Sequence, residues 1–285
     1  MSELRGVITA MATPFDPEGR VDEAAARRLA GYLVENGSHG VVVAGSTGEA
    51  ATLDDREHID LLRAVVDEIG AEATVVCGTG TNDTRHSIEL TRAAADAGAD
   101  AGLVVTPYYN KPNKAGIRAH FEAIAAAVPD LPLIVYNIPS RVVVNVPPAD
   151  LAELAEIESV VAVKQAQNQE LQQIEGMALL AGNDDGFLPT LELEGAGGIL
   201  VASHLVGPQM REMWDAAQAG NLARAREIDS GLRNLYDVLS ITNPIPLKAA
   251  LQMSGLIPHG GLRLPLVEAD DEQRAAVRAA LDAIR

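Results

Sequence analysis

The sequence contains a single cysteine, four lysines and no long hydrophobic run among its 285 residues. With Cys77 alone, the chain cannot form an internal disulfide, which is typical of proteins from a reducing cytoplasm. No apolar run reaches the roughly 18 residues that a membrane-spanning helix needs. The first residues, Met-Ser-Glu-Leu-Arg, show no signal-peptide pattern. We therefore expect a soluble, cytoplasmic protein.

Basic residues are scarce relative to acidic ones. Lysine and arginine total 22 against 40 aspartates and glutamates, which gives a formal net charge of −18. Such a chain repels polyphosphates, which argues against a nucleic-acid partner. The acidity fits either a high-salt cytoplasm or a bias in composition, and the composition does not separate the two. Hydrophobic residues make up 47% of the chain, as in ordinary globular proteins.

Several common catalytic signatures are also missing. The six histidines lack metal-ligand spacing, and no Gly-x-Ser-x-Gly nucleophile motif occurs. Cys77 has no positive charge beside it in the sequence to activate its thiol. The pair Asp184-Asp185 has no partners in sequence and is typical of a helix start. The sequence therefore predicts neither a metal nor a cofactor.

Short apolar runs alternate with longer amphipathic stretches over the first three quarters of the chain. The runs lack polar alternation, as expected of parallel strands covered on both faces. Predicted strands are Gly6–Met11, Gly40–Ala44, Thr74–Gly78, Gly102–Thr106, Leu133–Tyr136, Val160–Lys164, Leu179–Ala181 and Gly198–Ala202. Predicted helices between them include Asp54–Ile69, Asp83–Ala97 and Lys114–Ala127, with Asp54 and Asp83 opening two helices and Gly70 and Gly98 closing them.

This alternation predicts an α/β protein with a (β/α)₈ TIM barrel. The turn after the first predicted strand reads Ala12-Thr13-Pro14-Phe15. An open doubly wound sheet would usually carry a glycine-rich dinucleotide turn there. We place the catalytic barrel in residues 1–218 and a C-terminal helical extension, packed on the barrel, in residues 219–285.

In such a barrel, functional side chains lie at the C-terminal ends of the strands. Lys164 is the one lysine within a predicted strand, Val-Val-Ala-Val-Lys-Gln. Burial of an ammonium disfavours its charged form, so this amine can attack a carbonyl. Lys248 lies early in a predicted helix, where we expect its stem to cover apolar surface while the ammonium reaches water.

Hydroxyl groups follow several of the other strands. Tyr136 ends the fifth predicted strand, next to Lys164 in a barrel, and its phenol can move protons during imine formation. Because an isolated phenol has a pKa near ~10, the proton needs a relay through other hydroxyls. Ser46, Thr47 and Tyr109 supply hydroxyls at the same end of the barrel. Arg141 follows the fifth strand and can bind a carboxylate with two hydrogen bonds.

Taken together, these motifs resemble the dihydrodipicolinate synthase / N-acetylneuraminate lyase family over nearly the whole chain. The matching segments follow one another in family order. They are Thr13-Pro14-Phe15, Gly45-Ser46-Thr47-Gly48-Glu49, Thr106-Pro107-Tyr108-Tyr109-Asn110, Tyr136-Asn137-Ile138-Pro139-Ser140-Arg141, Val163-Lys164, Gly182-Asn183-Asp184 and Asn243-Pro244-Ile245-Pro246 with Lys248.

The resemblance implies a pyruvate-dependent, Schiff-base-forming lyase. By it, Lys164 forms the imine with pyruvate, and the proton relay consists of Tyr136, Ser46 and Tyr109. Tyr109 would come from a neighbouring subunit, which implies a homotetramer built as a dimer of dimers. The residues implied in substrate binding are Thr47 for the pyruvate carboxylate, with Gly182 and Val201 lining the pocket.

Within the family, the segments containing Tyr109 and Arg141 resemble the synthase branch. That branch joins pyruvate to L-aspartate 4-semialdehyde in lysine and diaminopimelate biosynthesis, with Arg141 meeting the carboxylate of the semialdehyde. Three positions depart from the synthase pattern, namely Ser46, Gln165 and Val143. Two alternatives stay open: an aldolase for N-acetylneuraminate, a 2-keto-3-deoxy sugar acid or 4-hydroxy-2-oxoglutarate, and a non-catalytic barrel that binds small carboxylates.

The family's lysine-feedback site is matched only in part. Asn82, Tyr108 and His58 fit its pattern, whereas Asp55 and His86 stand where histidine and glutamate are usual. Without that glutamate, the resemblance implies weak or absent inhibition by lysine.

Overall fold

The computed structural model describes residues 4–284. Its eight parallel strands form a closed barrel in which they follow one another in chain order. The predicted TIM barrel is confirmed, and the predicted strand ends are correct to within about two residues. The strands are β1 Gly6–Ala10, β2 Gly40–Val43, β3 Thr74–Gly78, β4 Ala101–Val105, β5 Leu133–Asn137, β6 Val160–Gln165, β7 Ala178–Ala181 and β8 Gly197–Leu200.

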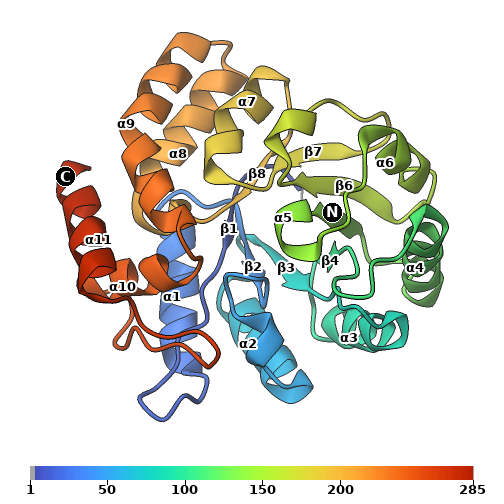
Figure 1. Ribbon diagram of the computed structural model, residues 1–285, viewed down its shortest axis with the longest axis horizontal. Helices are drawn as coiled ribbons and strands as arrows, with labels where there is room; N and C mark the ends of the chain where they lie inside the picture. Colours follow the sequence, from blue (N-terminus) through green and yellow to red (C-terminus); the bar gives the residue numbers. More distant parts are fainter. Residues whose placement is uncertain (1–3, 285) are drawn as a thin grey trace.

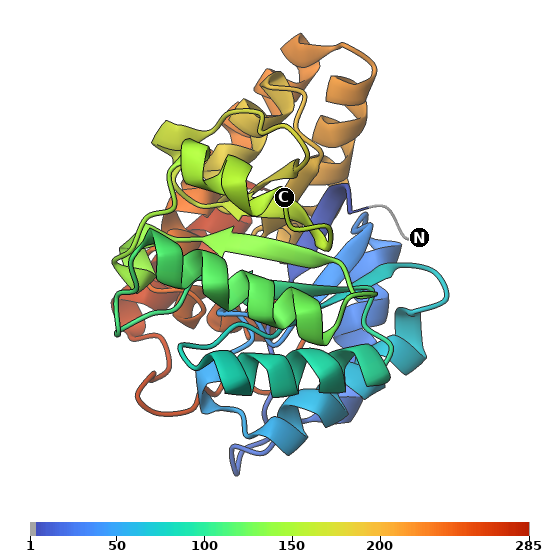
Figure 2. The same cartoon turned by 90° about the vertical axis from the view of Figure 1, so that its right-hand side faces the viewer.

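Helices surround this barrel (Figure 1), and a side view shows α3 and α4 next to each other on its outer surface (Figure 2). The α-helices are α1 Glu23–Glu35, α2 Asp55–Ile69, α3 Thr84–Asp96, α4 Lys114–Ala127, α5 Pro139–Val142, α6 Pro148–Leu154, α7 Phe187–Glu192, α8 Ser203–Gln218, α9 Leu222–Ser240, α10 Ile245–Met253 and α11 Asp271–Ala283. Single-turn 3₁₀ helices are η1 Ala50–Thr52, η2 Asn168–Glu170 and η3 Asp184–Gly186.

Helix ends follow the capping residues of the sequence. The Asp54 carboxylate accepts the backbone N–H of Glu57, and the Glu57 side chain accepts the N–H of Asp54 in return. Asp83 caps α3 with a single bond, in which its carboxylate accepts the N–H of Arg85. Gly70 ends α2, and Gly98 follows the cap of α3 with a φ of +90°, which only glycine adopts freely.

Side chains alternate between the inside of the barrel and the layer beneath the helices. Along β6, Ala162 belongs to the cluster that fills the barrel, whereas Val163 packs with residues of the surrounding helices. Because successive side chains of a strand point to opposite faces, Lys164 points inward and Gln165 outward. The alternation along β6 therefore places the Lys164 amine at the mouth of the barrel.

The C-terminal helices α9, α10 and α11 lie together on one flank, beside α8 and α1 (Figure 1). Leu232 and Leu239 of α9 share one continuous core cluster with Leu29 of α1 and Val41 of β2. The extension thus packs on the barrel helices, while its division from the barrel at residue 218 stays a prediction. Within residues 4–284, no helix is both long enough and apolar enough to cross a membrane.

Candidate active site

Lys164 and Tyr136 are direct neighbours at the C-terminal ends of adjacent strands. They are paired in the register between β5 and β6. Both side chains are almost fully buried, with 6% of Lys164 and 5% of Tyr136 exposed. The Lys164 Nζ lies 4.2 Å from the centroid of the Tyr136 ring. The structure therefore brings together the two residues that the sequence singles out for carbonyl chemistry.

Burial sets the protonation of both groups. It lowers the pKa of Lys164 to about 7, although the charge of Asp184 acts to raise it and that of Arg141 lowers it further. Burial raises the pKa of Tyr136 to about 12, against the opposing effects of Arg141 and a hydrogen bond with Ser46. Near neutral pH, a sizeable share of the amine is uncharged while the phenol keeps its proton. The pair thus combines a nucleophile with a proton donor.

The segment 45–49 forms a tight loop after β2. Glu49 takes a left-handed conformation with φ of 56°, and its N–H donates to the carbonyl of Ser46 at 3.1 Å. The Ser46 side chain is exposed at the mouth, whereas Thr47 is buried. Thr47 Oγ1 accepts a hydrogen bond from Asn243 Nδ2 at 2.9 Å. The loop carries two hydroxyls, and that of Ser46 shares a hydrogen bond with Tyr136, the neighbour of Lys164.

Arg141 belongs to the short helix α5, which follows β5. Its side chain is exposed, and Nη2 donates to the carbonyl of Asn243 at 3.3 Å. Its charge acts on both Lys164 and Tyr136. A guanidinium in this place can bind the carboxylate of a second molecule that reacts at the amine.

Gly182 and Val201 lie at the ends of β7 and β8. A side chain at Gly182 would meet Ala166 and Gln165 at 2.8 Å, so the close approach of β6 and β7 requires glycine here. The N–H groups of Val201 and Ala202 donate to Asp184 Oδ1 at 2.9 and 3.0 Å. Asp184 opens η3, so the predicted helix start is confirmed. Its partners come from β8 because folding brings β7 and β8 together. Burial raises the pKa of Asp184 to about 6.

Tyr109 does not join this group in the single chain. It lies between β4 and α4 with 88% of its surface exposed, and its φ of 70° is unusual for a tyrosine. Its neighbour Tyr108 is 37% exposed. A large aromatic ring left in solvent suggests a surface that another molecule covers.

Comparisons with known proteins show the family of the chain. Residues 3–284 match the dihydrodipicolinate synthetase family. The chain belongs to this family. A 4-hydroxy-tetrahydrodipicolinate synthase from a Cyanothece strain is 44% identical, covering 100% of this chain and 99% of the relative.

Solved structures of family members superpose closely. A dihydrodipicolinate synthase from Cyanidioschyzon merolae with lysine bound has a TM-score of 0.94 and 40% identity, covering 98% of this chain and 97% of that one. An Acinetobacter baumannii dihydrodipicolinate synthase complexed with pyruvate has a TM-score of 0.94 and 37% identity, covering 99% of both chains.

Gln165, one of the departures from the family's synthase pattern, lies outside the mouth. Its Oε1 accepts hydrogen bonds from Asn137 Nδ2 and from the N–H of Gln167, each at 3.0 Å. It is 1% exposed and faces the layer between strands and helices. Gln165 therefore supports the loops after β5 and β6 and is turned away from a ligand on Lys164.

Lys248 is not where the sequence suggested. Its side chain is fully buried, and Nζ donates to Glu49 Oε1 at 2.6 Å and to the carbonyl of Gly261 at 2.7 Å. The expectation that its ammonium reaches water was wrong, because α10 is enclosed on every side. Its neighbours Leu247 and Leu251 are fully buried as well. The apolar residues on either side of Lys248 in the sequence were the local signal for its burial.

The residues compared with the feedback site lie around α2, α3 and the loops after β3 and β4. His58 is 5% exposed, and its Nε2 lies 3.4 Å from Cys77 Sγ. Burial lowers the pKa of His58 and raises that of Cys77 to about 12, so this contact does not activate the thiol. Asp55 and His86 are joined by a hydrogen bond of 2.9 Å, and Asn82 accepts a bond from Asn110 through its carbonyl.

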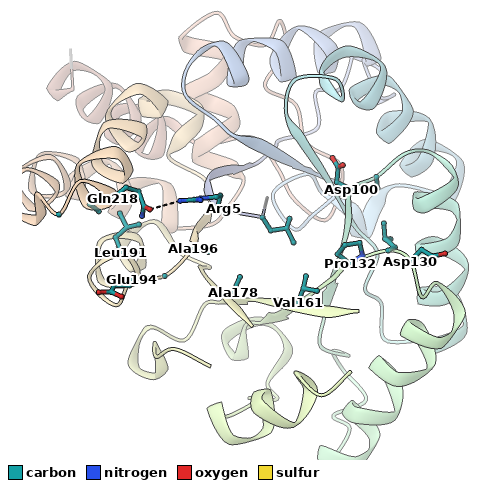
Figure 3. Close-up of a pocket in the computed structure, with 16 residues that line it drawn as sticks. Arg5, Asp100, Asp130, Pro132, Val161, Ala178, Leu191, Glu194, Ala196 and Gln218 are labelled. Atoms are coloured by element: carbon teal, nitrogen blue, oxygen red, sulfur yellow. Dashed lines mark hydrogen bonds between the residues drawn. The ribbon is translucent and has the colours of Figure 1, made fainter. Parts of the chain in front are cut away.

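A cavity of about 1040 Å³ opens at the other end of the barrel, where the strands begin (Figure 3). Its lining includes Arg5, Asp100, Val161 and Ala178, and Arg5 bonds Gln218 across it. We place the chemistry at the opposite mouth, because the buried amine and the hydroxyls lie there. Among residues 4–284, no cluster of three or more His, Cys, Asp and Glu side chains could hold a metal.

Proposed function

We propose that this protein catalyses the condensation of pyruvate with L-aspartate 4-semialdehyde in lysine and diaminopimelate biosynthesis; its relatives are named 4-hydroxy-tetrahydrodipicolinate synthase. The observation that carries the proposal is the buried amine of Lys164, with a pKa lowered to about 7, beside the phenol of Tyr136. A buried, partly uncharged amine at the mouth of a barrel is suited to covalent attack on a carbonyl.

The reaction begins with attack of the Lys164 amine on the C2 carbonyl of pyruvate. Loss of water from the carbinolamine gives an imine, and loss of a proton from the methyl group gives an enamine. The enamine carbon attacks the aldehyde, whose oxygen takes up a proton. The amino group of the new chain then displaces Lys164 by transimination and closes the ring. Tyr136 and Ser46 transfer protons in these steps, since they share a hydrogen bond.

Binding of the two substrates is divided between two loops. Thr47 and the N–H groups of its loop hold the pyruvate carboxylate, and Gly182 and Val201 line the pocket around it. Arg141 binds the carboxylate of the semialdehyde, because it is exposed at the mouth and its charge reaches Lys164. Gly182 serves by leaving space, since a side chain there would clash.

The geometry favours the synthase over other pyruvate aldolases. Gln165 faces away from the mouth, and Val143 is a 67% exposed residue that caps α5. Neither is placed to select a substrate on Lys164. The third departure, Ser46, keeps the hydroxyl that the relay needs, while Arg141 supplies a partner for the semialdehyde carboxylate.

Two measurements test the function. Borohydride reduction with pyruvate should attach a pyruvate-derived adduct to Lys164, identified by peptide mass mapping; a non-catalytic carboxylate-binding barrel would give none. A coupled assay should show turnover with L-aspartate 4-semialdehyde. Preferred cleavage of N-acetylneuraminate, a 2-keto-3-deoxy sugar acid or 4-hydroxy-2-oxoglutarate would instead assign an aldolase.

We further propose a homotetramer, a dimer of dimers in which Tyr109 completes the relay of a neighbouring subunit. Its 88% exposure in the single chain supports this arrangement. Mixing Lys164→Ala and Tyr109→Phe subunits tests it, because a mixed dimer contains one site with both residues only if the tyrosine crosses over. Recovery of activity supports the exchange, and no recovery contradicts it. Sedimentation equilibrium gives the number of subunits.

We expect lysine to inhibit weakly. The buried position of His58 and the bond between Asp55 and His86 leave these groups engaged with the protein itself, while Asn82 and Tyr108 keep the family pattern. A lysine titration that shows strong inhibition at sub-millimolar concentration would contradict this.

A cytoplasmic location is the last part of the proposal. It is supported by the single, buried, free thiol of Cys77. Cell fractionation with a cytoplasmic marker enzyme tests it.

A further inference from the structure

The most deeply buried ion pair among the described residues does not include Lys164, Tyr136 or Ser46. Lys248 of α10 and Glu49 of the loop after β2 have side chains 0% and 1% exposed. Lys248 Nζ also lies 4.1 Å from the centroid of the Phe15 ring, whose segment follows β1. The pair therefore joins the C-terminal extension to loops at the barrel mouth. The pair gives the Glu49 carboxylate a short, directional contact with α10.

Glu49 in turn fixes the loop that carries Ser46 and Thr47. Its second carboxylate oxygen accepts the N–H of Arg263 at 3.0 Å, so the side chain is held from two directions. Its own N–H donates to the carbonyl of Ser46 at 3.1 Å and closes the turn. A displacement of the Glu49 side chain therefore moves the turn itself.

The same C-terminal segment holds the loop at a second point. Asn243, immediately before α10, donates from Nδ2 to Thr47 Oγ1 at 2.9 Å. It also accepts a bond from Arg141 through its carbonyl. One segment thus reaches the loop proposed to bind the pyruvate carboxylate and the arginine proposed to bind the second substrate.

We propose that Glu49 and Lys248 are positioning residues for the pyruvate-binding loop, through which the C-terminal helix α10 sets the geometry of Ser46 and Thr47. Neither residue touches substrate. The inference rests on the proposed function. Its effect is on pyruvate binding first, because the loop holds the carboxylate, and on turnover second, because Ser46 bonds Tyr136. A shift of about 1 Å in such a loop costs up to ~10²-fold in rate.

The first test shortens each of two carboxylates by one methylene. Glu49→Asp withdraws the carboxylate from Lys248, and we expect the pyruvate KM to rise about tenfold. Half-saturation of borohydride trapping should rise by the same factor. Glu192→Asp is the matched control, since Glu192 of α7 pairs with Arg226 of α9, apart from the group formed by Glu49, Lys248 and Arg263. It should leave the pyruvate KM unchanged. Equal KM values for both variants and the wild type would overturn the proposal.

The second test separates positioning from stability. Glu49→Leu with Lys248→Met replaces the ion pair by apolar side chains, and such replacements often preserve folding. A melting temperature near wild type with a raised pyruvate KM supports positioning. If the melting temperature and the pyruvate KM are both those of the wild type, the pair has a structural role only. Should this variant fail to fold, the comparison of Glu49→Asp with Glu192→Asp decides alone. Absence of any pyruvate adduct in the wild type would refute the proposed function itself, a distinct outcome.

Discussion

Two lysines of this protein are buried, and each lies against an aromatic ring. Lys164 is 6% exposed and its Nζ is 4.2 Å from the Tyr136 centroid; Lys248 is 0% exposed and 4.1 Å from the Phe15 centroid. Burial lowers the pKa of both amines. By exposure and ring contact alone, the two sites are nearly the same.

Their polar partners differ. Lys248 donates to Glu49 and to the carbonyl of Gly261, so its N–H groups are engaged and a carboxylate favours its charged form. Lys164 lies against the ring of Tyr136, and the charge of Asp184 acts on it from a distance. An amine becomes a nucleophile when its lone pair is free and a substrate can reach it. Burial is therefore necessary for this chemistry and is not sufficient for it.

The two lysines should differ most in activity when each is changed to methionine. Lys164→Met should lower turnover by about 10⁴-fold or more, because the covalent route is lost. Lys248→Met should keep the pyruvate adduct on Lys164. A coupled assay and borohydride trapping measure both. An adduct on Lys248, or turnover that survives Lys164→Met, would contradict the assignment.

The two rings differ by one hydroxyl, which Tyr136→Phe removes while keeping the ring. We expect kcat to fall by about 10²–10³-fold, because proton transfer loses its donor. Trapping with borohydride should still label Lys164, more slowly. Tyr32→Phe, in α1 and away from the mouth, is the control and should behave as wild type. A Tyr136→Phe variant with normal kcat would remove the phenol from the relay.

The same methionine variants should shift stability in opposite directions. Lys248→Met leaves Glu49 buried without a partner and should lower the free energy of unfolding by about 3–5 kcal/mol. Lys164→Met removes an amine whose burial is unfavourable and should raise it by about 1–3 kcal/mol near pH 7. Urea or thermal unfolding measures both changes. Shifts of the same sign would show that the two lysines are held alike.

The advantage of Lys164→Met should shrink as pH rises. The pKa of Lys164 is about 7 in the folded protein, against 10.5 for an ordinary lysine. Between these values the unfolded chain binds more protons, so the wild-type protein gains stability with increasing pH. Unfolding of the wild type and Lys164→Met at pH 7 and pH 10 tests the sign. A gap that widens with pH would contradict the lowered pKa.

The sequence predicted one of these lysines and not the other, for a physical reason. Lys164 lies in one of the short apolar runs that alternate with amphipathic stretches, and this alternation already places it in a barrel strand. Lys248 lies in a helix, and a helix can turn a lysine toward water or toward the core. Its partner, Glu49, is 199 positions away in the sequence, and no local pattern encodes such a contact.

The loop contacts show the same limit. Ser46 and Thr47 were predicted because they follow a strand, yet the bond from Asn243 to Thr47 spans 196 positions. Asp184 lacked a partner in sequence because Val201 and Ala202 meet it only when the barrel closes. Local patterns thus predict which residues reach the mouth, and the packing of distant segments decides how they are held there.

The smallest predicted effect concerns Asp184. Its charge acts on Lys164 from a distance, whereas Lys248 bonds its carboxylate, Glu49, directly. Asp184→Asn keeps an oxygen to accept the N–H groups of Val201 and Ala202 but removes the charge. Because that charge acts to raise the pKa of Lys164, its loss should lower this pKa below about 7. The acid limb of pyruvate trapping should then move to lower pH.

Asp185→Asn is the matched control, since Asp185 is exposed and its charge acts on Asp184 instead. The pH profile of borohydride trapping should shift clearly only for Asp184→Asn, with rates above pH 8 unchanged within about twofold. A profile that stays in place would mean that burial alone sets the amine's pKa. A profile that moves to higher pH would mean that the neutral amide stabilises the charged amine, and that the role assigned to the Asp184 charge has the wrong sign.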